Sequence, residues 1–209
     1  NAYDTRAIIF ATGANPRKLG VEGEDRFYGM GVSYCATCDG AFFKGQVTAV
    51  VGGGNTAFED ALYLARFCSK VYLIHRSENY RAAASLVGKA KADPKIELLT
   101  NRTVEQIIGD TTVKELRIKN VLDNTAETIA CSGVFIAVGR IPETALAGKY
   151  VHLTRQGFIQ TDRAMRTNVP GIFAAGDVRD TPLRQIVTAA ADGAVAATSA
   201  IYYINELEG

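Results

Sequence analysis

The stretch Val47-Thr48-Ala49-Val50-Val51-Gly52-Gly53-Gly54-Asn55-Thr56-Ala57 decides the fold of this 209-residue chain. Its first five residues are apolar or β-branched, which predicts a buried strand that ends at the glycines. Thr56–Phe67 follows with apolar residues at helical spacing, and Val71–Ile74 is another apolar run. Val47–Ile74 is therefore predicted to form one βαβ unit, in which a helix joins two parallel strands.

The turn of this unit has a sequence suited to phosphate binding. Gly52–Ala57 fits the pattern G-x-G-x-x-G/A, in which the first glycine makes a tight turn. Gly54 would let a pyrophosphate approach the backbone, and Ala57 is small enough for the helix to pack closely on the strand. A glycine-rich hexapeptide alone is often an ordinary turn. The strand before it and the helix after it favour a dinucleotide site at the helix N-terminus.

The end of the next strand indicates which dinucleotide binds. An NAD-binding unit needs Asp or Glu there for the ribose 2′-hydroxyl, whereas this chain has His75-Arg76 and then Arg81. Guanidinium groups bind a 2′-phosphate through charge-assisted hydrogen bonds. Glu78 lies between the two arginines, so a solvated charged turn is the competing interpretation. The position within the βαβ unit favours NADPH.

Outside this unit, short apolar runs that end in glycine alternate with segments of helical period. Three such endings resemble one another, at Ile8–Gly13, Val134–Gly139 and Ile172–Asp177, which suggests two related nucleotide-binding units. The fold class is therefore predicted to be α/β with a parallel core sheet. We expect a buried strand at Ala7–Ala11, a connector at Arg17–Gly31, a helix at Ala82–Lys91 that Asp93-Pro94 ends, and strands at Ile96–Leu99, Val104–Ile108, Glu115–Lys119 and Cys131–Val138. Glu115–Lys119 alternates charged and apolar residues, which is typical of a half-exposed antiparallel strand.

Composition narrows the class of protein. Apolar residues make up 47% of the chain, and 23 basic side chains nearly balance 22 acidic ones. That balance disfavours nucleic acid or an anionic membrane as the main partner. The apolar runs are shorter than the roughly 20 residues that span a bilayer, and four cysteines are too few for a disulfide scaffold. We expect a cytoplasmic globular protein.

Cys35-Ala36-Thr37-Cys38 is the second chemical signal. Zinc would need two more ligands at suitable spacing, and Cys68, Cys131, His75 and His152 do not supply them, so no metal is expected. A C-x-x-C beside a dinucleotide site favours thiol–disulfide exchange. Asp39 follows directly, either as a proton donor and acceptor or as a plain turn residue. Cys68 and Cys131 are interpreted as small buried hydrophobic residues.

Taken together, these motifs resemble the bacterial, low-molecular-weight thioredoxin reductases. The likeness begins at Ser33–Gly40 and the Gly52–Ala57 turn, and the motifs that continue it along the chain are His75-Arg76, Val138-Gly139, Gly176-Asp177-Val178 and Arg184-Gln185-Ile186. The resemblance implies two Rossmann-type domains of the pyridine nucleotide-disulfide oxidoreductase kind, with an NADPH domain inserted in an FAD domain. It also implies that electrons pass from NADPH through FAD and the Cys35–Cys38 disulfide to thioredoxin, and that the enzyme is a homodimer.

By position, the resemblance implies a role for each matched residue. Cys38 would face the flavin, Cys35 would attack thioredoxin, and Asp39 would be the acid–base residue. The cofactor-binding residues would be Gly52, Gly54, Asn55, Thr56, Ala57, Arg76 and Arg81 for NADPH, and Thr12, Gly13, Asp177, Val178, Arg184, Gln185 and Ile186 for FAD. His75, Gly139 and Gly176 would also belong to the cofactor-binding residues. The domains would be 1–16 as a remnant of the FAD domain, 17–142 for NADPH with the C-x-x-C, and 143–209 as the rest of the FAD domain.

The sequence departs from the family pattern at two places. Ser77 stands where a second arginine usually follows His75-Arg76, which weakens the NADPH preference without reversing it. The glycine-rich FAD turn expected far upstream of Ile8 is not in the chain, so the FAD domain should be incomplete. We therefore expect NADPH binding, weak or no FAD binding, and better order between about Gly31 and Arg140 than at the ends. Cys35 and Cys38 should form a reversible disulfide, while Cys68 and Cys131 stay reduced.

Three other functions compete with a thioredoxin reductase. A flavoprotein that serves a peroxidase shares the C-x-x-C and the fold. A relative that takes electrons from ferredoxin lacks the NADPH residues, so Gly52, Gly54, Arg76 and Arg81 disfavour it. A non-catalytic NADPH-binding fragment would lack flavin altogether, and the visible spectrum of the purified chain would reveal it.

Overall fold

A computed structural model describes residues 2–209, and the chain divides into two compact units. One unit, Arg17–Gly139, is called here the inserted unit, because its sequence interrupts that of the other. The second, called the split unit, holds the chain up to Pro16 together with Arg140–Gly209. The chain thus enters the split unit a second time at Arg140. The boundary predicted after residue 142 lies slightly beyond this point.

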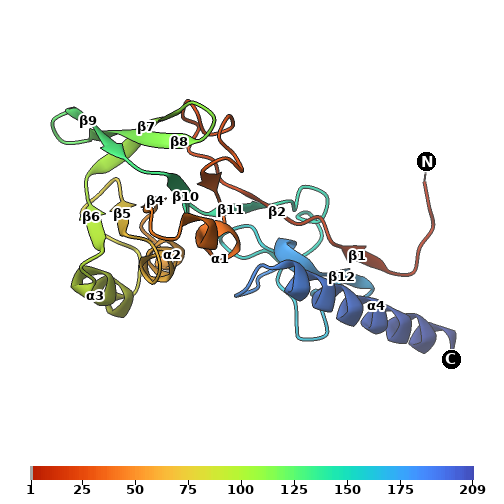
Figure 1. Ribbon diagram of the computed structural model, residues 1–209. Coiled ribbons are helices and arrows are strands. Elements are labelled where there is room, and N and C mark those ends of the chain that lie inside the picture. The colour runs from red at the N-terminus through yellow and green to blue at the C-terminus, as the bar shows by residue number, and fades with distance from the viewer. Residues whose placement is uncertain (1) are drawn as a thin grey trace. The chain divides into compact units, whose positions relative to one another are not determined.

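The inserted unit is built on a five-stranded parallel sheet (Figure 1). Its strands are ordered β3 (Val32–Ser33), β10 (Gly133–Ile136), β4 (Val47–Val51), β5 (Lys70–Ile74) and β6 (Ile96–Leu99). The predicted βαβ unit is present, with helix α2 at Asn55–Ala65 between β4 and β5. Helix α2 ends at Ala65, so Cys68 lies in the turn after the helix. Helix α3 (Ala84–Ala92) ends just before Asp93-Pro94.

Both faces of this sheet are covered. Successive residues of β4 point to opposite sides, so Val50 packs with Phe58 and Leu64 of α2, while Ala49 packs with Leu116 on the other face. That other face is covered by an antiparallel meander of three strands, β7 (Arg102–Gly109), β8 (Val113–Asn120) and β9 (Ala126–Ala130). In β8, Leu116 and Ile118 are fully buried between exposed charged residues, which confirms the predicted half-exposed antiparallel strand. β9 was not predicted.

The split unit has much less sheet. β1 (Ile8–Phe10) pairs in parallel with β12 (Ile172–Ala174), and β2 (Ala14–Pro16) pairs antiparallel with β11 (Arg140–Pro142). A 23-residue helix, α4 (Ile186–Glu208), packs its buried small residues against Phe173. This helix was not predicted, although its run of alanines favours a helix.

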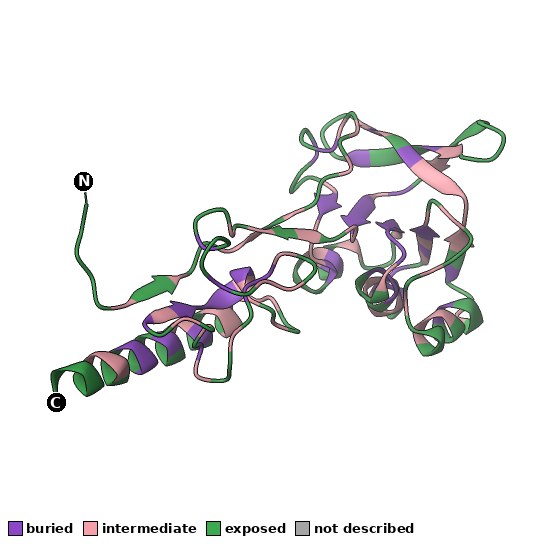
Figure 2. Cartoon of the chain, turned by 180° about the vertical axis from the view of Figure 1, so that it is seen from behind, coloured by how far each residue is buried: buried purple, intermediate pink, exposed green. Residues whose placement is uncertain are grey.

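The prediction that Ala7–Ala11 is a buried strand is wrong about burial. Ile8 and Ile9 of β1 remain 42% and 39% exposed (Figure 2). The reason is that, among the described residues, β1 has a sheet neighbour only in β12, so one edge and part of one face stay open.

Candidate functional site

The glycine-rich turn lies at the point of the parallel sheet where ligands are expected to bind. β4 has β5 on one side and β10 on the other, and the chain reaches β10 only after completing β5 and β6, so the order of connections reverses at β4. Ligands of such sheets bind at the carboxyl ends of the strands beside this reversal. Gly52 follows β4 there, and a Cβ on it would lie 2.4 Å from the Ala137 carbonyl oxygen after β10. Only glycine allows this approach of the two strand ends.

The N-terminus of α2 is open to a ligand. Gly54 is the N-cap residue and offers no side chain to the free backbone N–H groups of the first turn. A Cβ built on Gly54 would meet no atom within 4 Å. Backbone donors that face open space at a helix N-terminus are suited to a phosphate group.

The segment that carries the two arginines is tied to this turn. The Arg81 N–H donates to the Gly53 carbonyl at 2.8 Å, and the Ala83 N–H donates to Asn55 Oδ1 at 2.8 Å. Arg81 is therefore held beside the glycines, and its side chain is exposed, as is that of Arg76. Glu78, which favoured the competing interpretation, accepts a hydrogen bond from Asn101 at 3.1 Å. The structure thus brings together the turn and the arginine segment that the sequence singled out.

His75 supports the turn rather than facing solvent. Its ring lies against Gly53, where a Cβ would come within 2.2 Å of the ring. Burial, together with the charges of Arg76 and Arg81, lowers the pKa of His75 below its usual value, which favours the neutral ring. Ser77, the residue at which the sequence departs from the family pattern, points toward this ring. Its Oγ lies 3.0 Å from His75 Nε2.

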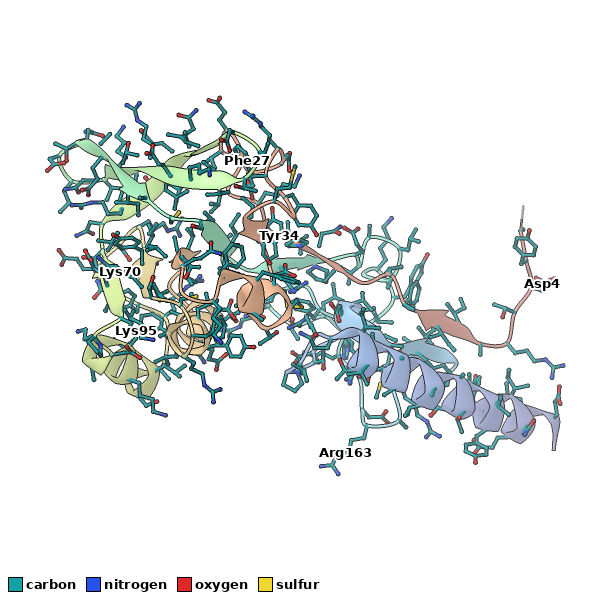
Figure 3. The ribbon with its side chains drawn as sticks, in the orientation of Figure 1. Asp4, Phe27, Tyr34, Lys70, Lys95 and Arg163 are labelled. Carbon is teal, nitrogen blue, oxygen red and sulfur yellow. A yellow bond between two sulfur atoms is a disulfide. The ribbon has the colours of Figure 1, made fainter. Side chains whose placement is uncertain are left out.

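The second site is the cysteine pair, which follows Tyr34 (labelled in Figure 3) and forms a Cys35–Cys38 disulfide in the inserted unit. Cys35 caps the short helix α1 (Ala36–Asp39), and its Sγ accepts a hydrogen bond from the Cys38 N–H at 3.2 Å. Cys38 is exposed and Cys35 is half-buried. Reagents can therefore reach at least one sulfur of the pair.

The other two cysteines are buried free thiols. Burial raises the pKa of Cys68, and it raises that of Cys131 to about 12. A thiol that cannot ionise near neutral pH is a poor nucleophile. Their environment agrees with the structural role predicted for both.

Two polar residues for which the sequence predicted no role support the cysteine loop. Ser33 Oγ donates to Asp39 Oδ2 at 2.6 Å and accepts from the Cys35 N–H at 3.0 Å. Glu24, only 2% exposed, accepts from the Tyr34 hydroxyl at 2.8 Å and from the backbone N–H groups of Leu19 and Gly20. Burial, then this hydrogen bond, raises the pKa of Tyr34. Ser33 opens the Ser33–Gly40 motif, although the sequence predicted no role for it. Glu24 carries no sequence periodicity, so no local signal could have identified it.

In the split unit, three of the residues predicted to bind FAD, Gly176, Asp177 and Val178, form a short turn. The Gly176 N–H donates to Asp192 at 3.1 Å, and the same carboxylate binds Arg179 through two hydrogen bonds of 2.5 and 3.0 Å. Asp177 lies 4.0 Å from Arg140. Asp192, which the sequence analysis missed, therefore fixes the turn from helix α4.

Three further residues of the predicted set lie at or just before the start of α4. The Arg184 guanidinium lies 4.2 Å from the centre of the Phe158 ring, and its Nε is buried without a hydrogen-bond partner among the described residues. Gln185 is the N-cap residue of α4, and Ile186 is 91% exposed. A buried N–H donor with no acceptor costs free energy, so this position is suited to a polar ligand atom.

The remaining predicted residues lie at strand ends. In the split unit, Thr12 Oγ1 donates to the Glu143 carbonyl at 2.5 Å, and the Glu143 N–H donates to the Gly13 carbonyl at 2.9 Å. In the inserted unit, Gly139 follows β10 with a φ of 115°, which favours glycine. Within residues 2–209, no cluster of His, Cys, Asp and Glu is arranged to hold a metal ion, and none of the helices has the length and apolar character needed to cross a membrane.

Comparison with known proteins places these sites in a family. The family model described as pyridine nucleotide-disulphide oxidoreductase matches residues 1–193, most of the chain. This chain belongs to that family. The fold class predicted from the sequence is thereby confirmed, as is the resemblance to thioredoxin reductases described next.

Several proteins similar to this chain are thioredoxin reductases. That of Listeria innocua is 48% identical over 207 residues, which cover 99% of this chain and 65% of the relative. That of Treponema pallidum is 42% identical and is covered over 67% of its length. A crystal structure of thioredoxin reductase from Streptococcus pyogenes superposes with a TM-score of 0.89 at 44% identity, covering 96% of this chain and 66% of that one. The chain thus spans about two thirds of the length of the proteins that it matches.

Proposed function

We propose that this chain belongs to an NADPH-dependent thioredoxin reductase, in which electrons pass from NADPH through FAD to the Cys35–Cys38 disulfide and then to thioredoxin. One observation carries the proposal: the disulfide and the glycine turn at the sheet reversal occur in the same compact unit. The relatives named thioredoxin reductase, at 42–48% identity, support this activity over other uses of the same fold.

The inserted unit fits NADPH. The uncapped N-terminus of α2 at Gly54 offers N–H donors to a pyrophosphate, and Asn55, Thr56 and Ala57 form its first turn. Arg76 and Arg81 supply positive charge at the end of β5, where a 2′-phosphate would lie. His75 stays neutral and holds the turn, so it would contribute shape rather than charge.

The split unit fits part of an FAD site. The buried Arg184 Nε has no acceptor among residues 2–209. Asp177 and Val178 share a turn with Gly176, whose N–H donates to Asp192. Thr12, Gly13, Gln185 and Ile186 would complete this part of the site. FAD, when bound, supplies a relay of two electrons between a nicotinamide and a disulfide.

The chemistry at the disulfide uses groups of this chain. Reduction takes two electrons and two protons, breaks the bond between Cys35 and Cys38 and leaves two thiols. The thiolate of Cys35 would then attack a thioredoxin disulfide, and Cys38 would displace the reduced thioredoxin from the mixed disulfide. Asp39, held by Ser33 at 2.6 Å, would give and take the proton at the leaving sulfur.

The test is to record the visible spectrum of the purified chain, titrate NADPH and FAD separately, and then assay thioredoxin reduction. We expect NADPH binding, little or no flavin retained on purification, and NADPH-dependent reduction of thioredoxin when FAD is supplied in excess. Reduction of a peroxidase partner but not of thioredoxin would favour the flavoprotein that serves a peroxidase. Failure of the chain to bind FAD even in excess would favour a non-catalytic NADPH-binding fragment. The cytoplasmic location, the homodimer and the lack of a nucleic-acid or membrane partner stay predictions.

A further inference from the structure

The hydroxyl of Ser33 has three polar neighbours, all of them in the cysteine loop. It accepts a hydrogen bond from the Cys35 N–H at 3.0 Å. It lies 2.6 Å from Asp39 Oδ2 and 3.3 Å from the Cys35 carbonyl oxygen, both of which are acceptors. Ser33 itself is on β3, only 4% exposed, and aligned with Phe135 of β10 in the parallel sheet. Its hydroxyl is therefore fixed to the sheet while the loop around it carries out the chemistry.

A hydroxyl has one proton and two acceptor lone pairs, so it can serve only one of the two acceptors at a time. The 2.6 Å contact with Asp39 is in the range of an O–H donor to an ionised carboxylate. When Asp39 takes up a proton, the carboxyl becomes a donor and can give its own hydrogen to Ser33 Oγ. The serine proton then has an acceptor at the Cys35 carbonyl, 3.3 Å away. In both protonation states, the Asp39 carboxyl therefore keeps its hydrogen bond to Ser33 without changing its orientation.

We propose that Ser33 is a positioning residue for exchange at Cys35–Cys38, which holds the Asp39 carboxyl in place in both its charged and its neutral state. Asp39 can then gain or lose a proton without turning its side chain. The Asp39 N–H also donates to the Cys35 carbonyl at 3.1 Å, so the carboxyl and the disulfide share one turn of backbone. This inference rests on the proposed role of the disulfide, but it does not depend on either cofactor or on thioredoxin.

The step to be measured is reduction of the disulfide by dithiothreitol. One thiolate of the reagent attacks a sulfur of the pair, the protein disulfide bond breaks and a mixed disulfide forms. The second thiol of the reagent then displaces the remaining cysteine and closes a ring. Two electrons pass from the dithiol to the protein, and the two protons of the dithiol reside finally on Cys35 and Cys38. Asp39 carries a proton to the leaving sulfur.

The experiment compares Ser33→Thr with Ser33→Val in the chain as it stands, without nucleotide or flavin. Threonine and valine have the same shape, so packing changes cancel and only the hydroxyl differs. Reduction is followed by alkylating the new thiols at set times, from pH 5 to 9, and rates are expressed per reagent thiolate.

The expected effect is a change in the rate of exchange. A positioned acid or base accelerates a reaction by roughly 10²- to 10⁴-fold, and we expect loss of the support for Asp39 to slow exchange by about tenfold. Ser33→Thr should keep the wild-type rate and pH profile. Ser33→Val should be slower across this pH range.

A double-mutant cycle separates positioning from a general loss of structure. If Ser33 acts through Asp39, Ser33→Val should slow exchange much less in an Asp39→Ala background than in the wild type. Thr48→Val is the matched control, because it removes a fully buried hydroxyl from β4 of the same sheet, outside the cysteine loop. Equal rates and profiles for Ser33→Thr and Ser33→Val would overturn the inference, and so would an undiminished effect without Asp39. If exchange behaves as expected but thioredoxin is not reduced, only the proposed function fails.

Discussion

The two units of this chain differ in how completely they bury their strands. β4 of the inserted unit has a parallel neighbour on each side, α2 on one face and the meander on the other, and its last four residues are buried. β1 of the split unit pairs only with β12 among the described residues, and Ile8 and Ile9 stay about 40% exposed. Both sequences look alike, since each is a short apolar run that leads to glycine. Burial is therefore a property of the neighbours that the fold supplies rather than of the strand.

This difference predicts which of the proposed sites tolerates substitutions better. The glycine turn, the arginine segment and the disulfide all lie in the unit with the complete sheet. The turn at Gly176–Val178 and the orphaned Arg184 lie in the unit with the smaller cores. The nucleotide binding proposed for the inserted unit should thus be less sensitive to substitutions outside the site than the flavin binding proposed for the split unit.

The largest expected effect concerns the thiols of the inserted unit. After reduction, two additional thiols should react rapidly with an alkylating reagent, those of Cys35 and Cys38. Cys131, whose pKa is raised to about 12, is ionised in on the order of 10⁻⁴ of molecules at pH 8, so it should react more slowly by about 10³-fold or more. Mass spectrometry of alkylated peptides measures each rate. Fast labelling of Cys68 or Cys131 in the native chain would show that the core of this unit opens readily.

The second prediction compares the two units directly by hydrogen exchange. Amides of β4 should exchange only through opening of the whole inserted unit, whereas amides of β1 should exchange through local opening. We expect a difference of roughly 10²- to 10³-fold in protection, read by mass spectrometry after peptic digestion. Equal protection of Val50 and Ile9 would contradict the idea that missing neighbours loosen β1.

The third prediction concerns the ion pair that fixes the turn of the split unit. Asp192→Asn should destabilise that unit by about 2–4 kcal/mol, because it leaves Arg179, 15% exposed at its side chain, without its charged partner. Arg179 lowers the pKa of Asp192, so the stabilisation is fully present above the ordinary pKa of about 3.9 and is lost as the pH falls through the lower, folded value.

Thermal unfolding of wild type and variant, measured from pH 7 down to about pH 2, checks both parts. The two stabilities should converge on acidification. Glu206→Gln is the control, since it neutralises an exposed carboxylate on the same helix. A gap between wild type and Asp192→Asn that persists at pH 2 would mean that packing, and not charge, accounts for the effect.

The fourth prediction tests the arginine segment. Arg76→Ala should weaken NADPH binding roughly 10- to 150-fold, since a hydrogen bond to a charged group contributes about 1.5–3 kcal/mol. NADH binding should hardly change, because NADH lacks the 2′-phosphate. Isothermal titration with both nucleotides measures this, with Arg66→Ala, an exposed arginine at the opposite end of α2, as the control. Equal weakening of both nucleotides would refute the 2′-phosphate role of Arg76.

The smallest effect is expected at an exposed ion pair of the inserted unit. Lys70 and Glu97 lie 2.7 Å apart on neighbouring strands, but their side chains are 40% and 49% exposed (Figure 3). Glu97→Gln should therefore change the stability by less than about 1 kcal/mol, and salt should reduce the difference further. Denaturant titration at low and high salt checks this. A loss as large as that for Asp192→Asn would show that burial does not decide the strength of these pairs.

The sequence alone predicted those parts of the chain whose structure depends on residues close together in the sequence. The strand, glycine turn and helix at Val47–Ala65 follow from the spacing of the apolar residues and from the need for glycine at position 52. Both signals are encoded within a few residues. The alternation at Glu115–Lys119 likewise predicted β8 correctly, because a half-buried strand repeats every two residues. The C-x-x-C pair and the basic residues after β5 are local in the same sense.

Only the tertiary structure decided which polar groups pair and which apolar strands are covered. Glu24 reaches Tyr34, Ser33 reaches Asp39, and Asp192 reaches Arg179 because buried donors and acceptors must be satisfied once the backbone has packed. None of these pairings follows a periodic pattern. The exposure of Ile8 and Ile9 depends in the same way on strands distant in sequence, since sheet neighbours are chosen by the whole fold and not by the strand itself.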